Sequence, residues 1–155
     1  MRQFHPPLSP CIVQLEKTAD KALLEVALTH ASSRGESAFE RHEFLGDRVV
    51  GYLVARHVFA EHPTLPLGAL TRLLAVNVDT ERLARAAVAH GLHRFLRHNL
   101  ISLSSHIRDF SAEIADYPVH SIGLVTSPKI MGAVDIDSSH DQEQVWKVFG
   151  GWLIR

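Results

Sequence analysis

Three carboxylates lie close together in the segment AFERHEFLGDRVVGY, residues 38–52: Glu40, Glu43 and Asp47. On an α-helix, spacings of three and four residues place all three in one stripe. Like charges at these spacings repel by about 0.2–0.5 kcal/mol per pair. The stripe is therefore either a solvated surface offset by neighbouring arginines or a site for Mg²⁺. This hard ion prefers oxygen and is commonly held by one or two carboxylates together with substrate phosphates.

A glycine, Gly46, lies among these acids inside the same predicted helix. Glycine in a helix interior costs about 1 kcal/mol relative to alanine. A helix that keeps a glycine at this position is expected to need the close approach of another backbone or of a ligand. This feature strengthens the interpretation as a site, beside the alternative of a plain solvated face.

The elements that must position the acids are predicted to be helical throughout. The acidic helix is expected from about residue 38, with Ser37 as its cap, to residue 61, before Pro63. Apolar residues at helical spacing predict further helices in KALLEVALTHAS, ALTRLLAVNV, ERLARAAVAHGL and DQEQVWKVFGGWLIR. No alternating pattern indicates a strand, so the predicted fold class is all-α, a compact helical bundle.

Polar residues and a glycine mark several expected helix ends. Asp79 or Thr80 is predicted to cap the helix that contains ERLARAAVAHGL, and Gly91 to end or kink it. Ser139 and Gln142 have the spacing of a capping box and are predicted to open the last helix.

Length and composition indicate one intracellular domain. The 155 residues favour a single core, with residues 1–11 as a lead-in and residues 12–155 as the domain. No apolar run is long enough to cross a membrane, and no clear targeting peptide is recognised. A single cysteine, Cys11, suits a reducing compartment. The net charge of −1 differs from that of a dedicated nucleic-acid binder, so any RNA contact is expected to use a local basic patch or metal ions.

The densest basic region is the candidate RNA contact. It could touch RNA phosphates without reading sequence, which is how most double-stranded RNA is recognised. The alternative is a solvated helix face with Glu81 as a partner. The region contains Arg82, Arg85, Arg94 and Arg97, with His90, His93 and His98 among them.

Several segments resemble one known family. FERHEFLGDRVV resembles the signature of the ribonuclease III family, usually written ERLEFLGDSVL. Upstream, LLEVALTHAS resembles that family's ALTHxS helix; downstream, GALTRLLAVNVDTERLARAAVAHGL resembles its GxLTxLRA…LA…LGL segment. The ending SPKI…VWKVF resembles the plant ribonuclease III-like branch. The motifs occur in the family's order from about residue 12 to residue 153, nearly the whole chain.

The resemblance implies an all-helical endonuclease domain that cuts double-stranded RNA as a homodimer, with Mg²⁺ as cofactor and Mn²⁺ as a substitute. Each subunit of that family gathers four acids around the metal. Glu43 and Asp47 match two of these, and Glu40 matches a further acid that faces the substrate cleft. Phe44 matches an aromatic residue that plugs the partner subunit.

One departure from the family affects the metal site directly. The family's other two acids lie on a late helix, PKVLADIVESIAGAIFID, where this chain reads PKIMGAVDID, residues 128–137. The two ends match and the acidic middle is absent, so we expect a helix shortened by about two turns near residues 129–134 and less complete cover of the acidic helix. Asp135 stands at an apolar position of the family.

Two functions remain open at this stage. The first, favoured by the family resemblance, is a Mg²⁺-dependent endoribonuclease that acts on double-stranded RNA in RNA processing. The second is a catalytically inactive dimerisation or RNA-binding module, because the second acidic pair is missing. No double-stranded-RNA-binding domain is recognised, so grip on the substrate is expected to come from the dimer cleft, an added protein or metal.

Overall fold

The described part of the chain is built from helices. The computed structural model describes residues 17, 20–34, 36–99, 105, 109 and 126–154; the predicted lead-in, residues 1–11, lies outside them. In chain order the elements are α2 (Lys21–Ala27), α3 (Ala31–Arg34), α4 (Glu36–Glu61), α5 (Leu67–Asn77), α6 (Thr80–Ala89), the 3-10 helix η1 (Leu92–Phe95), α8 (Thr126–Asp137) and α9 (Gln142–Leu153). The all-α prediction is confirmed.

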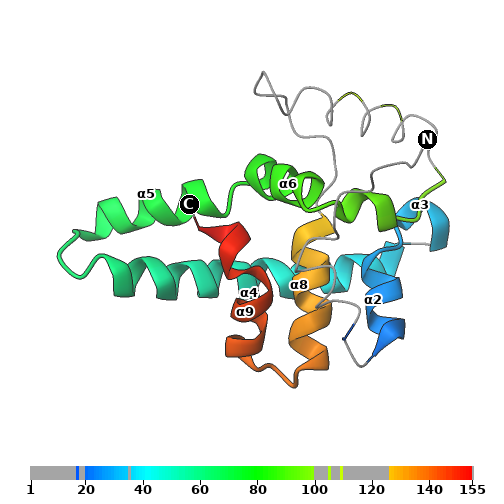
Figure 1. The fold of residues 1–155 in the computed structure, drawn as a ribbon, viewed down its shortest axis with the longest axis horizontal. Coiled ribbons are helices and arrows are strands. Elements are labelled where there is room, and N and C mark those ends of the chain that lie inside the picture. Colours follow the sequence, from blue (N-terminus) through cyan, green and yellow to red (C-terminus); the bar gives the residue numbers. More distant parts are fainter. Residues whose placement is uncertain are drawn as a thin grey trace, which may run out of the picture.

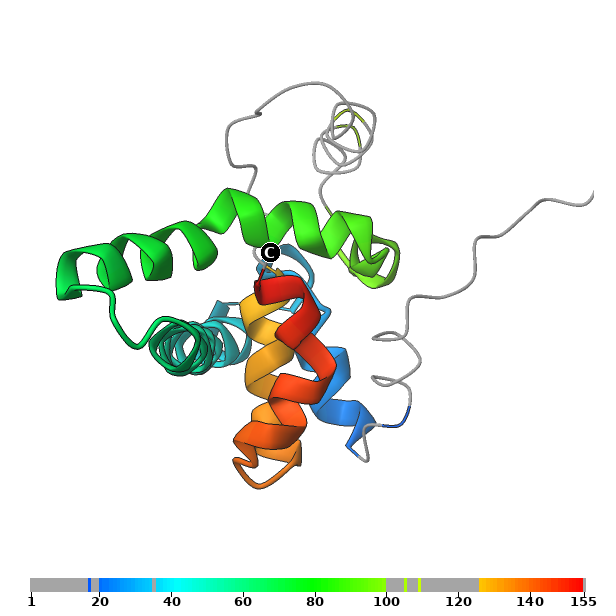
Figure 2. The same cartoon turned by 60° about the vertical axis from the view of Figure 1, so that its left-hand side comes forward.

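The helices form two crossing groups around α4. In Figure 1, α5, α6 and η1 run as one row above the long helix α4, while α2, α8 and α9 stand side by side across it. Figure 2 shows the same row from another side, lying over α4 and over the ends of α8 and α9. Helix α8 contacts α2, α4, α6 and α9, so it is the central element of the packing. Within the described residues, no helix is both long enough and apolar enough to pass through a membrane.

Helix α8 is buried along most of its length. Its residues Ile130, Met131 and Ala133 are inaccessible to solvent. They pack in one core with apolar residues of the neighbouring helices: Val49, Val50, Leu53 and Val54 of α4, Leu83 and Ala87 of α6, and Val145, Phe149 and Leu153 of α9. The late helix, expected in shortened form near residues 129–134, is α8, which has 12 residues from Thr126 to Asp137.

Two glycines allow α4 and α8 to cross at backbone contact. A Cβ atom on Gly46 would lie 1.6 Å from the carbonyl oxygen of Pro128 on α8. In the same crossing, a Cβ atom on Gly132 would lie 2.5 Å from the carbonyl oxygen of His42 on α4. Both distances are far below contact distance. The predicted close approach at Gly46 is therefore confirmed, and the approaching group is the backbone of α8.

Some helix ends agree with the predictions. Asp79 is the N-cap of α6, and its carboxylate accepts hydrogen bonds from the backbone N–H groups of Glu81 and Arg82, at 3.0 and 3.2 Å. Gly91 follows α6 with a φ of 77°, a left-handed conformation that glycine adopts without strain. Helix α4 ends at Glu61 as expected, but it begins at Glu36, so Ser37 lies within the first turn.

The predicted cap of the last helix is wrong. Ser139 has a φ of 56° and lies in the turn between α8 and α9. Asp141 caps α9 instead, accepting hydrogen bonds from the backbone N–H groups of Glu143 and Gln144, at 3.0 and 3.3 Å. Ser139 could cap the helix only if His140 were its first residue, but His140 has a φ of 64° and the helix begins at Gln142, directly after Asp141.

The first predicted helix is interrupted at its middle. Helix α2 ends at Ala27 and α3 begins at Ala31, with Leu28, Thr29 and His30 between them. The backbone of Arg97 donates to Leu28 at 2.8 Å and accepts from His30 at 2.8 Å. This short parallel bridge ties the residues after η1 to the first helices and replaces the intrahelical bonds of a continuous helix.

We predict that Gly46→Ala strongly destabilises the fold, because the new Cβ must push the backbones of α4 and α8 apart. The expected loss is at least about 2–3 kcal/mol of unfolding free energy, measured by urea denaturation followed by circular dichroism. Gly51→Ala on the same helix is the matched control, since a Cβ there meets nothing within 4 Å. That control should gain up to about 1 kcal/mol from helix propensity. Equal stabilities of the two variants would contradict the backbone contact.

We further predict that two histidines make stability depend on pH. Burial lowers the pKa of His90 and of His93, with a further contribution from the charge of Arg94 at His93. The unfolded chain therefore takes up more protons as the pH falls below about 6.5, the ordinary histidine value. Stability is present above that value and is lost as the pH falls through the lower folded-state pKa. A His90→Gln, His93→Gln variant should lose less stability between about pH 7.5 and about pH 5, as measured by thermal denaturation. His62→Gln, at an exposed position, is the control; an unchanged pH slope in the double variant would refute the prediction.

Candidate active site at the crossing of α4 and α8

The three predicted acids lie on one helix, as expected, and form what we call the acidic stripe: Glu40, Glu43 and Asp47. Helix α4 includes all three. Glu40 and Asp47 are exposed, whereas the Glu43 side chain is only 34% exposed because it lies against α8. The stripe is therefore open to solvent on one side and covered by protein at its middle residue.

A lysine that the sequence analysis did not single out lies against this stripe. The ammonium nitrogen of Lys129, in the first turn and a half of α8, is 3.2 Å from Oε2 of Glu43. Lys129 is 3% exposed, which is unusual for a lysine without an acidic partner. Its position next to Pro128, which contacts Gly46, explains why the lysine stem is enclosed. Nothing in the sequence pattern indicated this pairing, because Lys129 (in PKI) and Glu43 (in HEFLG) belong to segments far apart in the chain.

Charges within the site oppose one another. Burial lowers the pKa of Lys129, and the carboxylates of Glu43, Asp47 and Glu40 act in the opposite direction by stabilising the ammonium. Burial also raises the pKa of Asp47, with the negative charge of Glu43 adding to this rise and the charges of Arg48 and Lys129 opposing it. The charge of Lys129 reaches a further neighbour, because it helps burial to lower the pKa of His30. The pKa values of Lys129, Asp47 and His30 thus depend on the charges of their neighbours at the crossing.

The carboxylates fit a divalent cation only in part. Oxygen ligands suit Mg²⁺, and two carboxylates are sufficient when RNA phosphates and water complete the shell. Glu43 and Asp47 supply such a pair. Across the residues that the structure describes, however, no three His, Cys, Asp or Glu side chains converge on a point where a metal could be held. The stripe therefore fits an ion completed by substrate and does not form a closed protein cage.

The acids near the sequence gap lie at the other end of α8. Asp135 is 1% exposed, and its carboxylate accepts hydrogen bonds from Nδ1 of His140 at 2.6 Å and from Nε2 of Gln142 at 2.7 Å. Asp137 accepts a hydrogen bond from the backbone of Asp20 at 2.9 Å. The Asp135 carboxylate holds the turn before α9, and the Asp137 carboxylate holds the start of α2. Neither replaces the missing acidic pair.

Phe44 lies on the exposed side of α4. Its side chain is 67% exposed, and the guanidinium carbon of Arg48 lies 5.3 Å from the centre of its ring. Tyr52, two turns farther along the same helix, is also exposed. An exposed aromatic residue of this size is available for a partner subunit, and its role there stays a prediction.

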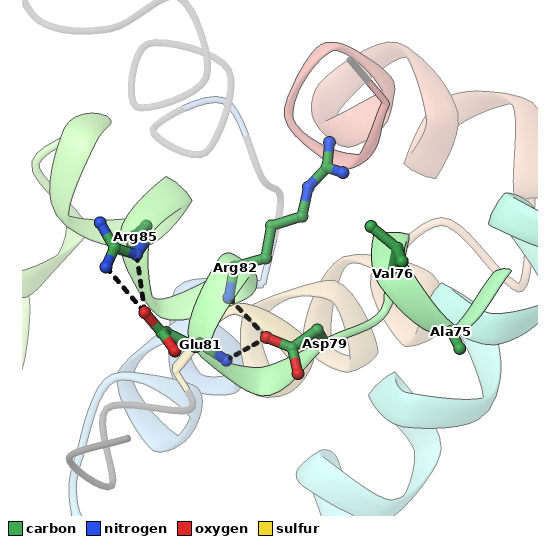
Figure 3. A pocket seen from close by; sticks show the side chains of 6 residues that line it. All are labelled: Ala75, Val76, Asp79, Glu81, Arg82 and Arg85. Atoms are coloured by element: carbon green, nitrogen blue, oxygen red, sulfur yellow. Dashed lines mark hydrogen bonds and ion pairs between the residues drawn. The ribbon is translucent and has the colours of Figure 1, made fainter. Parts of the chain in front are cut away.

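Two of the four arginines of the predicted RNA contact are paired with carboxylates. Arg85 forms an ion pair with Glu81 at 2.7 Å, and Arg97 pairs with Glu25. Figure 3 shows that the guanidinium of Arg82 points away from Glu81 and toward α9. This side chain borders a hollow of about 440 Å³ whose other lining residues are Ala75, Val76, Asp79, Glu81 and Arg85. Arg94 is exposed on η1.

The predicted partnership with Glu81 is thus present for Arg85. His90 and His93 add little positive charge near neutral pH, because burial lowers the pKa of both. Contact of this region with RNA stays a prediction.

The sequence matches the ribonuclease III domain over residues 40–144, more than half of the chain. It is 45% identical over 164 residues to Ribonuclease 3-like protein 3 of Oryza sativa subsp. japonica, covering 94% of this chain and 55% of that protein. It is 36% identical to Ribonuclease 3-like protein 2 of Arabidopsis thaliana, over 88% of this chain and 38% of the relative. Endoribonuclease Dicer homolog 1 of Arabidopsis thaliana is 39% identical over 84% of this chain, which spans 8% of that protein.

A solved structure shows the same fold. The nuclease domain of ribonuclease III from Campylobacter jejuni superposes with a TM-score of 0.72 at 24% identity, covering 92% of this chain and 95% of that one. This likeness concerns the fold alone. The sequence matches go further, although the chain spans about half the length, or less, of the relatives named above. Helices, acidic stripe and sequence matches agree: the chain belongs to the ribonuclease III domain family, in its plant ribonuclease III-like branch.

Proposed function

We propose that this chain acts on double-stranded RNA as an endoribonuclease of the ribonuclease III type, in RNA processing inside the cell. The observation that carries the proposal is the acidic stripe, which lies on α4 within the matched domain and is open to solvent on one side. Relatives that are endoribonucleases by name support the same reaction class.

Two residues of the stripe are assigned to the metal. Glu43 and Asp47 would hold Mg²⁺, or Mn²⁺ in its place, together with phosphate oxygens of the RNA. The bound ion supplies charge neutralisation at the phosphate and activation of a water nucleophile. Glu40, one turn earlier on α4 and exposed, faces the side from which the RNA backbone approaches. No covalent nucleophile is needed for this hydrolysis.

A homodimer is the second part of the proposal. Phe44 is the anchor that we assign to the partner subunit, because its ring is exposed on the same helix as the acids. Large aromatic residues that fill a pocket on the partner often carry much of the binding energy of an interface. Two stripes in one dimer would face the two strands of a duplex.

One observation favours a different function for this chain. The ion pair of Lys129 with Glu43 engages one of the two carboxylates assigned to the metal. A catalytically inactive ribonuclease III-like module, which dimerises and binds RNA without cutting it, is therefore the second candidate. It differs from the first in a single measurable property, the rate of phosphodiester cleavage.

The rate of phosphodiester cleavage can be measured directly. Purified protein incubated with long double-stranded RNA and Mg²⁺ should cut it, whereas a Glu43→Gln, Asp47→Asn variant should cut at least about 100-fold more slowly, since it loses the charges that hold the ion in the transition state. Both substitutions keep side-chain size, so the variant serves as the matched control for folding.

The outcomes separate the two candidates. If the unmodified chain cuts no faster than the control but binds RNA in a gel shift that weakens with salt, the inactive module is correct and the enzyme proposal fails. If it neither cuts nor binds RNA, both candidates fail.

We also predict that the dimer depends on Phe44. Phe44→Ala should weaken self-association by about 30-fold, equivalent to an interface anchor worth about 2 kcal/mol, in sedimentation equilibrium. Phe59→Ala is the control, because Phe59 is 72% exposed on the same helix, about four turns away. A monomeric unmodified chain at micromolar concentration, or equal effects of the two substitutions, would refute Phe44 as the anchor.

A further inference from the structure

Lys129 is a buried cation in direct contact with the acidic stripe. Its ammonium lies 3.2 Å from Glu43 Oε2, and its side chain is 4% exposed. Burial of a lysine is costly unless a carboxylate compensates for the lost water. The carboxylate that compensates here is one of the two assigned to the metal.

The backbone of Lys129 has little freedom to move away. The preceding residue, Pro128, has its carbonyl group against Gly46, and Gly132 on the next turn meets the backbone of α4 at His42. Ile130 and Met131 on the same helix are inaccessible to solvent. Lys129 is therefore held between two fixed points of the helix crossing, and moving its backbone would require separation of α4 and α8.

The surrounding charges favour a cation at this point. Glu43 contacts the ammonium, and the negative charges of Asp47 and Glu40 also act on it. A metal ion bound by Glu43 and Asp47 would need the same carboxylate oxygen and would lie close to the ammonium. Two like charges at such short range repel strongly in a partly desolvated site.

We propose that Lys129 is a resident cation of the acidic stripe, which competes with a divalent metal for Glu43 and keeps the metal affinity of the RNA-free protein low. This inference rests on the assignment of Glu43 and Asp47 to the metal. The Lys129 side chain then sets how much metal this chain requires, and RNA phosphates are needed to retain the ion.

The test measures metal binding without RNA. Mn²⁺ is titrated into the protein, and free Mn²⁺ is followed by electron paramagnetic resonance. Lys129→Met removes the charge and keeps a long apolar stem, and Glu43, whose side chain is 34% exposed, can then be hydrated. A charge at this range changes the affinity of a carboxylate for a proton by about 10- to 1,000-fold, so Lys129→Met should bind Mn²⁺ at least about tenfold more tightly.

Two controls make the result specific. Lys147→Met removes the same charge from an exposed position on α9 and should leave Mn²⁺ affinity within about twofold, because exposed distant charges are screened. Lys129→Met combined with Glu43→Gln should lose the gain. Equal affinities of Lys129→Met and Lys147→Met, or a gain that survives Glu43→Gln, would overturn the proposal.

The unmodified chain gives an independent measurement if Lys129→Met does not fold. Its affinity for Mn²⁺ without RNA should be weaker than about 1 mM and should tighten when a non-cleavable double-stranded RNA is added, since phosphates complete the shell. Tight binding without RNA would overturn the proposal. Failure of the proposed cleavage can be told apart from failure of this proposal. A chain that cuts no RNA can still bind Mn²⁺ more tightly when Lys129 is replaced.

Discussion

Gly46 and Gly132 let the backbones of α4 and α8 meet, and this contact fixes where each residue of α8 lies. A Cβ atom at either glycine would overlap a carbonyl oxygen of the opposite helix. Once the helices are this close, apolar residues on α8 fill the space between α2, α4, α6 and α9. The cost of glycine in a helix, about 1 kcal/mol each, is offset by the burial that the close crossing allows. The core and the site thus depend on one short-range contact.

The same contact determines the electrostatics of the site. Pro128 meets Gly46, so Lys129 must lie one residue farther along α8, where Glu43 is within 3.2 Å. The acidic stripe then has an internal counter-charge at its centre and solvent along its outer side. The net charge around the acids is set by which residue of the crossing helix faces them. It can therefore change while the signature segment on α4 stays the same.

Local signals were reliable where chemistry and geometry act within a few residues. The helix around the acids, a cap at Asp79 or Thr80 and a helix end at Gly91 were predicted, since helical spacing, capping side chains and glycine at a helix end work through nearby backbone groups. Prediction failed at Ser139, because Asp141, two residues later, caps α9 instead.

The sequence by itself determined the fold class, the acidic stripe and the family, because periodicity and ordered motifs are properties of the chain alone. Only the tertiary structure decided the environment of the stripe. It placed Lys129 beside Glu43, directed Asp135 to the turn before α9, and paired Arg85 and Arg97 with carboxylates. The physical reason is that charge and desolvation depend on distances between segments far apart in the chain, and those distances follow from how closely two backbones can pack.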